Sequence, residues 1–161
     1  MISMTYSVPI VLAAALSLLA GAAQAESGPF SALNGTWSGG GTLTTANGTQ
    51  DRLRCRASYT PGQGGEQLRL NIRCASDNYN FDLSSDVTSR NGQISGEWIE
   101  ASRNVSGRIT GRASSERVQA HARGDAFSAD LSLTTRGNRQ SVAIRPQGTE
   151  VQQVSLALSR R

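Results

Sequence analysis

The sequence predicts an all-β fold, an antiparallel up-and-down meander that closes into a barrel of eight to ten strands. Apolar and polar side chains alternate through most of the chain beyond its N-terminal segment, which is the period of half-buried strands. Gly, Asn, Asp and Ser interrupt the alternation at short intervals, as hairpin turns do. A sheet this long usually closes, because closure removes its exposed edges.

The first 25 residues are expected to form a cleaved signal peptide, followed by a single domain over residues 26–161. Val8 to Ala23 is apolar, and Ala23-Gln24-Ala25 is a small-x-small cleavage pattern. The apolar run is short for a bilayer span, so a retained anchor is the weaker alternative. The domain is therefore expected in the periplasm or outside the cell.

The only two cysteines, Cys55 and Cys74, flank a Pro-Gly-Gln-Gly-Gly turn symmetrically. Exported chains with an even number of cysteines usually pair them. Centring a hairpin on Gly64-Gly65 places the two residues opposite each other. We expect a disulfide across this hairpin; two buried free thiols are the alternative.

The other hairpins follow from matching apolar faces around each turn, with the sharpest turn signal at Asn91-Gly92. Further turns are placed at Asn47-Gly48, Ser76-Asp77, Ser102-Arg103, Ser114-Ser115, Gly124-Asp125 and Gly137-Asn138. A bulge near Gln152-Gln153 brings the last strand into phase. The expected pairs are Leu43 with Leu53, Gly41 with Cys55, Trp37 with Tyr59, Ala57 with Ile72, Tyr59 with Leu70, Ile72 with Phe81, Val87 with Gly96, Trp98 with Gly107, Ile109 with Ala120, Ala122 with Phe127 and Leu133 with Val142.

Charged side chains occupy the face opposite the apolar set, including Arg52, Arg73 and Glu97. An outer-membrane barrel would instead be apolar outside, with aromatic girdles. The pattern therefore favours a soluble barrel with an apolar interior that does not span a membrane.

The expected interior combines several inward glycines with five aromatic residues. Large and small side chains that interdigitate would fill it completely. Alternatively, the glycines leave room for a small apolar or amphipathic ligand. Glu100 is the polar side chain that we expect near the barrel rim, at the mouth of such a pocket. The candidate ligand-binding residues are Trp37, Tyr59, Phe81, Trp98 and Phe127.

Gly35-Thr36-Trp37, preceded by Asn34, resembles the Gly-x-Trp that opens the first strand of lipocalin and avidin-like (calycin) barrels. The chain as a whole resembles small exported β-barrel proteins of alphaproteobacteria. These resemblances imply a periplasmic or secreted barrel, and the calycin resemblance adds a ligand-binding interior.

All 16 basic residues are arginines, a bias that a GC-rich genome also produces. Five side chains form a candidate anion or partner face: Arg108, Arg112, Arg117, His121 and Arg123. Guanidinium groups match phosphate and carboxylate geometry, so an anionic envelope component is a candidate partner. This face also supports an alternative function, an interaction or inhibitor protein of the cell envelope; a solvated surface is the plainest interpretation. Nucleic acid is not expected, because the basic face lacks aromatic residues.

The chain has one histidine and neither a Gly-x-Ser-x-Gly elbow nor a phosphate loop. One histidine with scattered acids is a poor ligand set for a metal ion. The sequence therefore leads us to expect no enzymatic activity, no cofactor and no metal.

Overall fold

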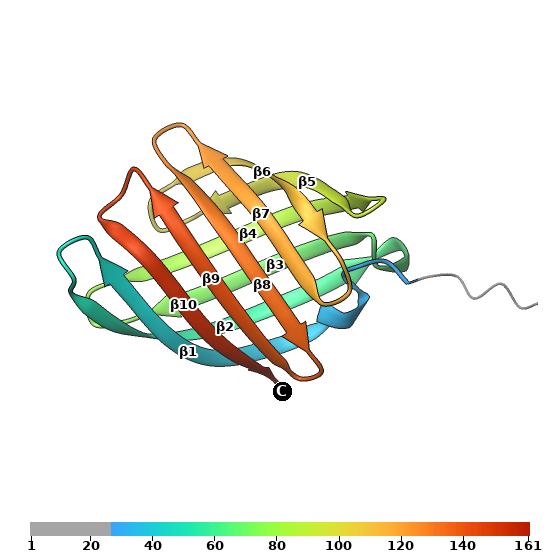
Figure 1. The fold of residues 1–161 in the computed structure, drawn as a ribbon, viewed down its shortest axis with the longest axis horizontal. Helices are drawn as coiled ribbons and strands as arrows, with labels where there is room; N and C mark the ends of the chain where they lie inside the picture. The colour runs from blue at the N-terminus through green and yellow to red at the C-terminus, as the bar shows by residue number, and fades with distance from the viewer. Residues whose placement is uncertain (1–26) are drawn as a thin grey trace, which may run out of the picture.

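The computed structural model describes residues 27–161, so the expected signal peptide lies outside the described residues. Ten antiparallel strands form one closed barrel in chain order, with β1 pairing with β10, which confirms the predicted fold class (Figure 1). In Figure 1, β7–β10 lie in front of β2–β4 and cross them at an angle. The elements are η1 (Ser31–Leu33), β1 (Gly35–Thr45), β2 (Gln50–Gly62), η2 (Gln63–Gly65), β3 (Gln67–Ala75), β4 (Asn80–Arg90), β5 (Gln93–Glu100), β6 (Val105–Ala113), β7 (Arg117–Gly124), β8 (Ser128–Arg136), β9 (Arg139–Gln147) and β10 (Val151–Arg160).

The short 3-10 helix η1 covers the end of the barrel where β1 begins, which we call the closed end. Phe30 and Leu33 are buried there, at 1% and 2% exposure. The indole Nε1 of Trp37 donates a hydrogen bond of 2.8 Å to the Leu33 carbonyl, which satisfies a buried donor and fixes the helix. Arg160 stacks on the same indole, 4.6 Å from the ring centroid. The opposite end, formed by the β1–β2, β3–β4, β5–β6, β7–β8 and β9–β10 connections, is called the loop end.

The predicted disulfide joins Cys55 of β2 to Cys74 of β3. The two residues are direct cross-strand partners, with their Cα atoms 4.1 Å apart and both side chains buried. The register of this hairpin is confirmed, including Ala57 opposite Ile72 and Tyr59 opposite Leu70. The disulfide therefore fixes the spacing of two adjacent strands from inside the barrel.

The hairpin at Asn91-Gly92 is also confirmed, with Val87 opposite Gly96. Both turn residues have positive φ, 52° and 76°, as a type I′ turn requires. The pairs of Trp98 with Gly107 and of Leu133 with Val142 agree with prediction as well. The expected bulge is present, because the β1–β10 register passes from Gln153 to Val151.

Four hairpins have a predicted register that is wrong by two residues. Three of the turns begin one residue later than expected: Ser76, Ser114 and Gly124 occupy the first turn position, and their backbone N–H groups donate to Tyr79, Arg117 and Phe127. The β1–β2 turn is instead centred one residue earlier than expected, on Asn47. A two-residue slip keeps every side chain on its face, so the inward set is unaffected. The observed partners are Leu43 with Asp51, Gly41 with Leu53, Trp37 with Ala57, Ile72 with Leu83, Ile109 with Ala122, and Ala122 with Ala129.

The strand glycines lie where neighbouring backbones approach closely. A Cβ on Gly41 would collide with the Ser155 carbonyl, and one on Gly107 would collide with the Arg123 carbonyl. At these positions glycine lets the strands curve into a barrel. The space that a side chain would need is therefore taken by backbone, and the glycines alone open no pocket.

Candidate functional site

The barrel interior has two unlike walls. The first, which we call the packed wall, is formed by the inward side chains of β10, β1 and β2. Trp37, Leu53 and Leu158 are exposed by only 0%, 1% and 2%. Close packing of this kind leaves no room for a ligand.

The second wall, which we call the lumen wall, is formed by apolar inward side chains of β3, β4, β6, β8 and β9 that remain partly exposed. Each lies near the middle of its strand and is flanked by hydrogen-bonded strands on both sides. The inward residues of the packed wall lie in equally well paired strands and are buried. The exposed surface of the lumen wall therefore belongs to its inward-facing side chains and not to its backbone. The members are Leu70, Leu83, Ile109, Leu131, Leu133, Val142 and Ile144.

The five predicted ligand-binding residues fall into separate groups. Trp37 and Tyr59 meet edge to face at the closed end, with ring centroids 6.3 Å apart. Trp98 and Phe127 meet edge to face toward the loop end, with centroids 5.3 Å apart. Phe81 lies opposite Cys74, next to the disulfide. Only Phe81 and Phe127 are partly exposed, so the structure does not bring all five side chains to one surface.

A buried polar network lies beneath η1 at the closed end. The Tyr59 hydroxyl donates to Gln140 Oε1 at 2.8 Å, and the Gln140 amide donates to Thr135 Oγ1 at 3.2 Å. Burial raises the pKa of the Tyr59 phenol well above its usual range, and the Gln140 hydrogen bond offsets part of that rise. The phenol therefore stays neutral and acts as a donor.

Glu100, predicted near the rim, is 7% exposed at the loop end. Its carboxylate accepts backbone hydrogen bonds from Asp82, Ser102 and Arg103, at 2.9, 3.2 and 2.9 Å. Burial raises the pKa of this carboxyl, but the hydrogen bonds together lower it by more. The pKa of Glu100 is therefore below its ordinary value. The side chain holds the β5–β6 loop against β4 and does not line an open mouth.

The predicted anion face lies on the outside of β6 and β7. Arg108 and Arg123 are direct cross-strand partners, a like-charge pair that is unfavourable without an anion between them. Arg112 pairs with Gln119 and Arg117 pairs with Thr134, so neither lies directly opposite another arginine of this face. Within residues 27–161, none of these four arginines forms an ion pair with a carboxylate.

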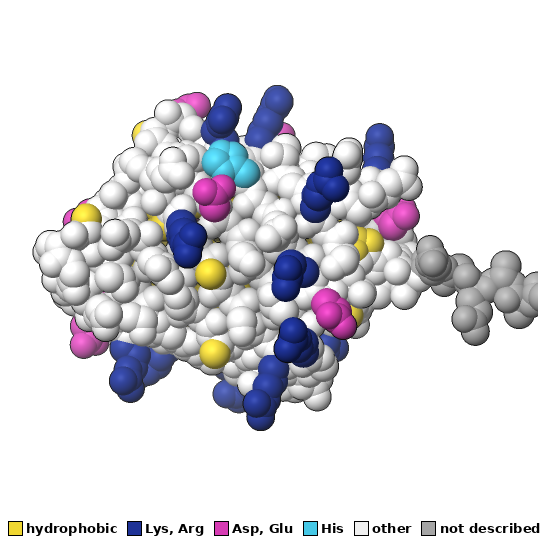
Figure 2. Space-filling model, in the orientation of Figure 1, with side chains coloured by type: hydrophobic (Ala, Val, Ile, Leu, Met, Phe, Trp, Pro, Cys, Tyr) yellow, Lys and Arg dark blue, Asp and Glu magenta, His cyan; other side chains and the backbone are white. Residues whose placement is uncertain are grey.

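The histidine has a carboxylate partner that the sequence did not reveal. His121 Nδ1 lies 2.8 Å from Asp130 Oδ1, and the two residues are cross-strand partners. Figure 2 shows this histidine with an acidic side chain beside it and several basic side chains spread over the same face. A carboxylate on Nδ1 orients an imidazole so that Nε2 is free to move a proton. The two side chains are exposed on the outer surface, at 39% and 60%.

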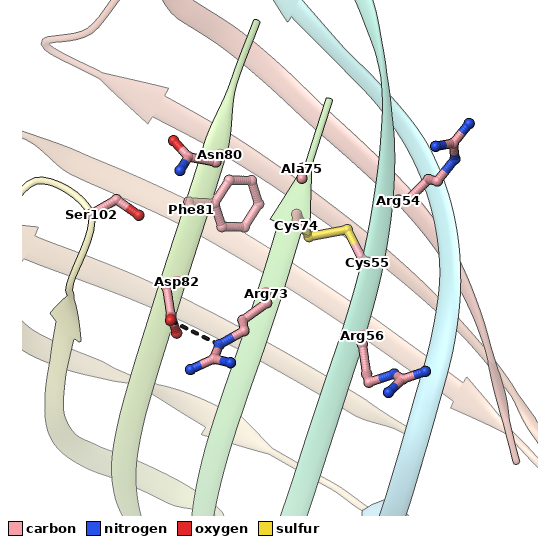
Figure 3. Close-up of a pocket in the computed structure, with 10 residues that line it drawn as sticks. All are labelled: Arg54, Cys55, Arg56, Arg73, Cys74, Ala75, Asn80, Phe81, Asp82 and Ser102. Atoms are coloured by element: carbon pink, nitrogen blue, oxygen red, sulfur yellow. Dashed lines mark hydrogen bonds and ion pairs between the residues drawn. A yellow bond between two sulfur atoms is a disulfide. The ribbon is translucent and has the colours of Figure 1, made fainter. Parts of the chain in front are cut away.

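Two hollows lie outside the lumen. One, of about 520 Å³, lies on the outer face of β2–β4 and is lined by Arg54, Arg56, Arg73 and Asp82 among others (Figure 3). The other, of about 460 Å³, lies among the loops of the loop end, between Asn47, Tyr79 and Glu150. No group of histidine, cysteine and acidic side chains within residues 27–161 is arranged to hold a metal ion. No helix in the same range is long and apolar enough to cross a membrane.

Comparison of the sequence with protein-family models and with curated proteins finds no match. Among solved structures, the S-type phycobiliprotein lyase CPES from Guillardia theta has a similar fold, with a TM-score of 0.56 and 12% sequence identity. The alignment covers 82% of this chain and 89% of the lyase. The likeness shows the barrel fold alone, and the calycin resemblance at Gly35-Thr36-Trp37 stays a prediction. The resemblance to alphaproteobacterial exported proteins stays a prediction.

This neighbour corrects the expectation that the chain is not an enzyme. A barrel of the same architecture is named a lyase, so the lack of a serine elbow or phosphate loop does not argue against catalysis in this fold. The earlier inference was wrong because it treated a few short motifs as the only route to chemistry.

Proposed function

We propose that the protein is an exported barrel that binds a small apolar or amphipathic ligand against its lumen wall. The observation that supports this proposal is the partial exposure of Leu70, Leu133 and Ile144 although they point inward at mid-strand. Apolar surface left accessible inside a barrel is stabilised when an apolar molecule covers it. The barrel fold shared with a phycobiliprotein lyase is compatible with a ligand-binding interior.

The ligand would enter at the loop end, between Phe81 and Phe127, whose side chains remain partly exposed. Trp98 would support this entrance through its edge contact with Phe127. Trp37 and Tyr59 would lie below the ligand without contacting it, because both are buried and η1 closes the barrel beyond them. The disulfide supports an oxidising compartment, the periplasm or the exterior.

Fluorescence of the apolar probe N-phenyl-1-naphthylamine tests this proposal. We expect enhanced, blue-shifted emission with the unaltered protein and loss of that signal in Leu133→Trp, which fills the lumen. Ser132→Trp is the matched control, because Ser132 is the exposed neighbour on β8 and its indole would lie outside. No enhancement with the unaltered protein, or equal enhancement in a folded Leu133→Trp variant, would contradict the proposal.

A second candidate function, an envelope interaction protein that acts through the arginine face, is favoured by the like-charge pair of Arg108 and Arg123. Reversal of Arg108, Arg112 and Arg117 to Glu should lower the salt concentration at which the protein elutes from immobilised heparin. Reversal of Arg136, Arg139 and Arg145 changes the net charge equally and is the control. An equal effect of both triple variants would contradict this function, because it would show that heparin binding depends on net charge alone and not on the arginine face.

A further inference from the structure

We call the hollow on the outer face of β2–β4 the outer recess. It forms where a small side chain lies among longer ones. Ala75 points outward near the end of β3, with Arg54 of β2 and Asn80 of β4 as its cross-strand partners. Arg56 and Arg73 are partners one step further along the same face. The methyl group therefore lies in a depression that longer polar side chains surround, and Cys55, Cys74 and Phe81 complete its lining.

The rim of the outer recess is strongly basic. Three guanidinium groups, those of Arg54, Arg56 and Arg73, line it together with one carboxylate, that of Asp82. Asp82 is already engaged, because it accepts a 2.8 Å hydrogen bond from Arg73 Nε. Within residues 27–161, Arg54 and Arg56 form no ion pair. Figure 3 shows Arg73 turned toward Asp82, while Arg54 and Arg56 extend from β2 on the other side.

The direct pairing of Arg56 with Arg73 is unfavourable unless a negative charge lies between them. The Nη atoms of Arg73 remain available, since only Nε contacts Asp82. Neutral donors complete the rim: the Asn80 amide and the Ser102 hydroxyl. Guanidinium, amide and hydroxyl groups around one depression are the donors that a tetrahedral oxyanion requires.

The floor and one side of the outer recess are held rigidly. The disulfide of Cys55 and Cys74 fixes the two strands beneath it. Glu100 anchors the backbone of Ser102, and Arg103 Nη1 donates to the Asn80 carbonyl at 3.0 Å, so the loop is held against β4. Rigid surroundings reduce the entropy lost when a ligand binds.

We propose that the outer recess is a binding site for a phosphate group, carried by a free phosphorylated molecule or by a lipid headgroup. The phosphate would lie over Ala75 and would draw the guanidinium groups of Arg54, Arg56 and Arg73 toward it, with Asn80 and Ser102 as further donors. The arginines of this site lie on the outward face of β2 and β3, so the proposal does not depend on a ligand in the lumen.

Titration with inorganic phosphate, followed by isothermal calorimetry, tests the proposal with two variants of different kind. Arg56→Gln with Arg73→Gln removes two charges, and we expect about tenfold weaker binding, as for loss of charge-assisted hydrogen bonds. Ala75→Leu fills the floor without changing charge and should weaken binding by a similar factor. Because Ala75 is exposed on the barrel surface, this variant is expected to fold.

Arg136→Gln with Arg139→Gln is the control, since it removes the same charge from another exposed part of the barrel. Flotation with phosphatidylglycerol vesicles separates the two sources of phosphate. Vesicle binding that Ala75→Leu abolishes assigns the site to a lipid headgroup, whereas binding of free phosphate alone assigns it to a free phosphorylated molecule. The proposal is overturned if neither probe binds, if Ala75→Leu binds as the unaltered protein does, or if the control loses as much affinity.

Discussion

The packed wall and the lumen wall are built from the same kinds of apolar residue but differ in how much of their side-chain surface stays exposed. Leu53 of β2 is 1% exposed, whereas Leu133 of β8, also inward and near mid-strand, stays partly exposed. The disulfide joins β2 of the packed wall to β3 of the lumen wall, and Phe30, Leu33 and Trp37 reinforce the packed wall at the closed end. Stability and accessible surface are thus separated within one small barrel, as expected where a stable scaffold carries a binding surface.

The largest expected effect comes from Trp37→Ala, which removes the centre of the packed wall. We expect a loss of about 3–5 kcal/mol in the free energy of unfolding, as for other buried aromatic residues. The change also removes the hydrogen bond to Leu33 and the surface on which Arg160 stacks. Urea unfolding followed by circular dichroism measures the loss. A cost below about 1 kcal/mol would show that η1 and this wall do not hold the barrel closed.

Replacement of both Cys55 and Cys74 by Ser should lower the free energy of unfolding by about 3 kcal/mol, because it increases the conformational entropy of the unfolded chain. The melting temperature should fall, while probe binding at the lumen wall stays unchanged below the transition. Calorimetry and N-phenyl-1-naphthylamine fluorescence on the same sample check both parts. Loss of probe binding in the folded variant would mean that the disulfide shapes the lumen.

A matched pair of truncations sharpens the comparison between the walls. Leu53→Ala should cost about 3 kcal/mol, since it leaves a cavity in a close-packed region. Leu133→Ala should cost about 1 to 2 kcal/mol, because part of that side chain is already accessible. Equal costs in urea unfolding would indicate that the two walls are packed alike.

The smallest effect expected concerns pH and the β5–β6 loop. The pKa of Glu100 is lower in the folded protein than its ordinary value of 4.5, so its contribution to stability is complete above that pH. As the pH falls through the lowered pKa, the carboxylate takes up a proton and the contribution disappears. The stability difference between the unaltered protein and Glu100→Gln should therefore shrink between pH 5 and pH 3. A difference that stays constant over this range would show that the carboxylate charge is not what anchors the loop.

The sequence predicted the inward set, the barrel and the disulfide because each depends on local alternation and turn chemistry. Asn91-Gly92 has one favoured turn, and its hairpin was predicted correctly. Ser76 and Ser114 are equally acceptable inside a turn or at its first position, so those hairpins were predicted with a slip of two residues. The same slip at Gly124 hid the pairing of His121 with Asp130.

The difference between the walls lay beyond prediction from the sequence. Alternation shows that Leu53 and Leu133 both point inward, but not how much surface the opposite strands leave accessible. Nor did the inward glycines mark the lumen, because the collision at Gly41 is with backbone of the neighbouring strand. The outer recess was missed for a related reason, since Ala75 forms a floor only beside the longer side chains of β2 and β4.

Xenon binding in a pressurised crystal tests the central claim most directly, since xenon occupies apolar internal space without needing a particular ligand. The account predicts xenon inside the barrel, in contact with Leu70, Leu133 and Ile144, and none along the packed wall beside Leu53. Xenon should be absent from the same position in Leu133→Trp. A barrel interior free of xenon, or xenon bound along both walls alike, would contradict the account.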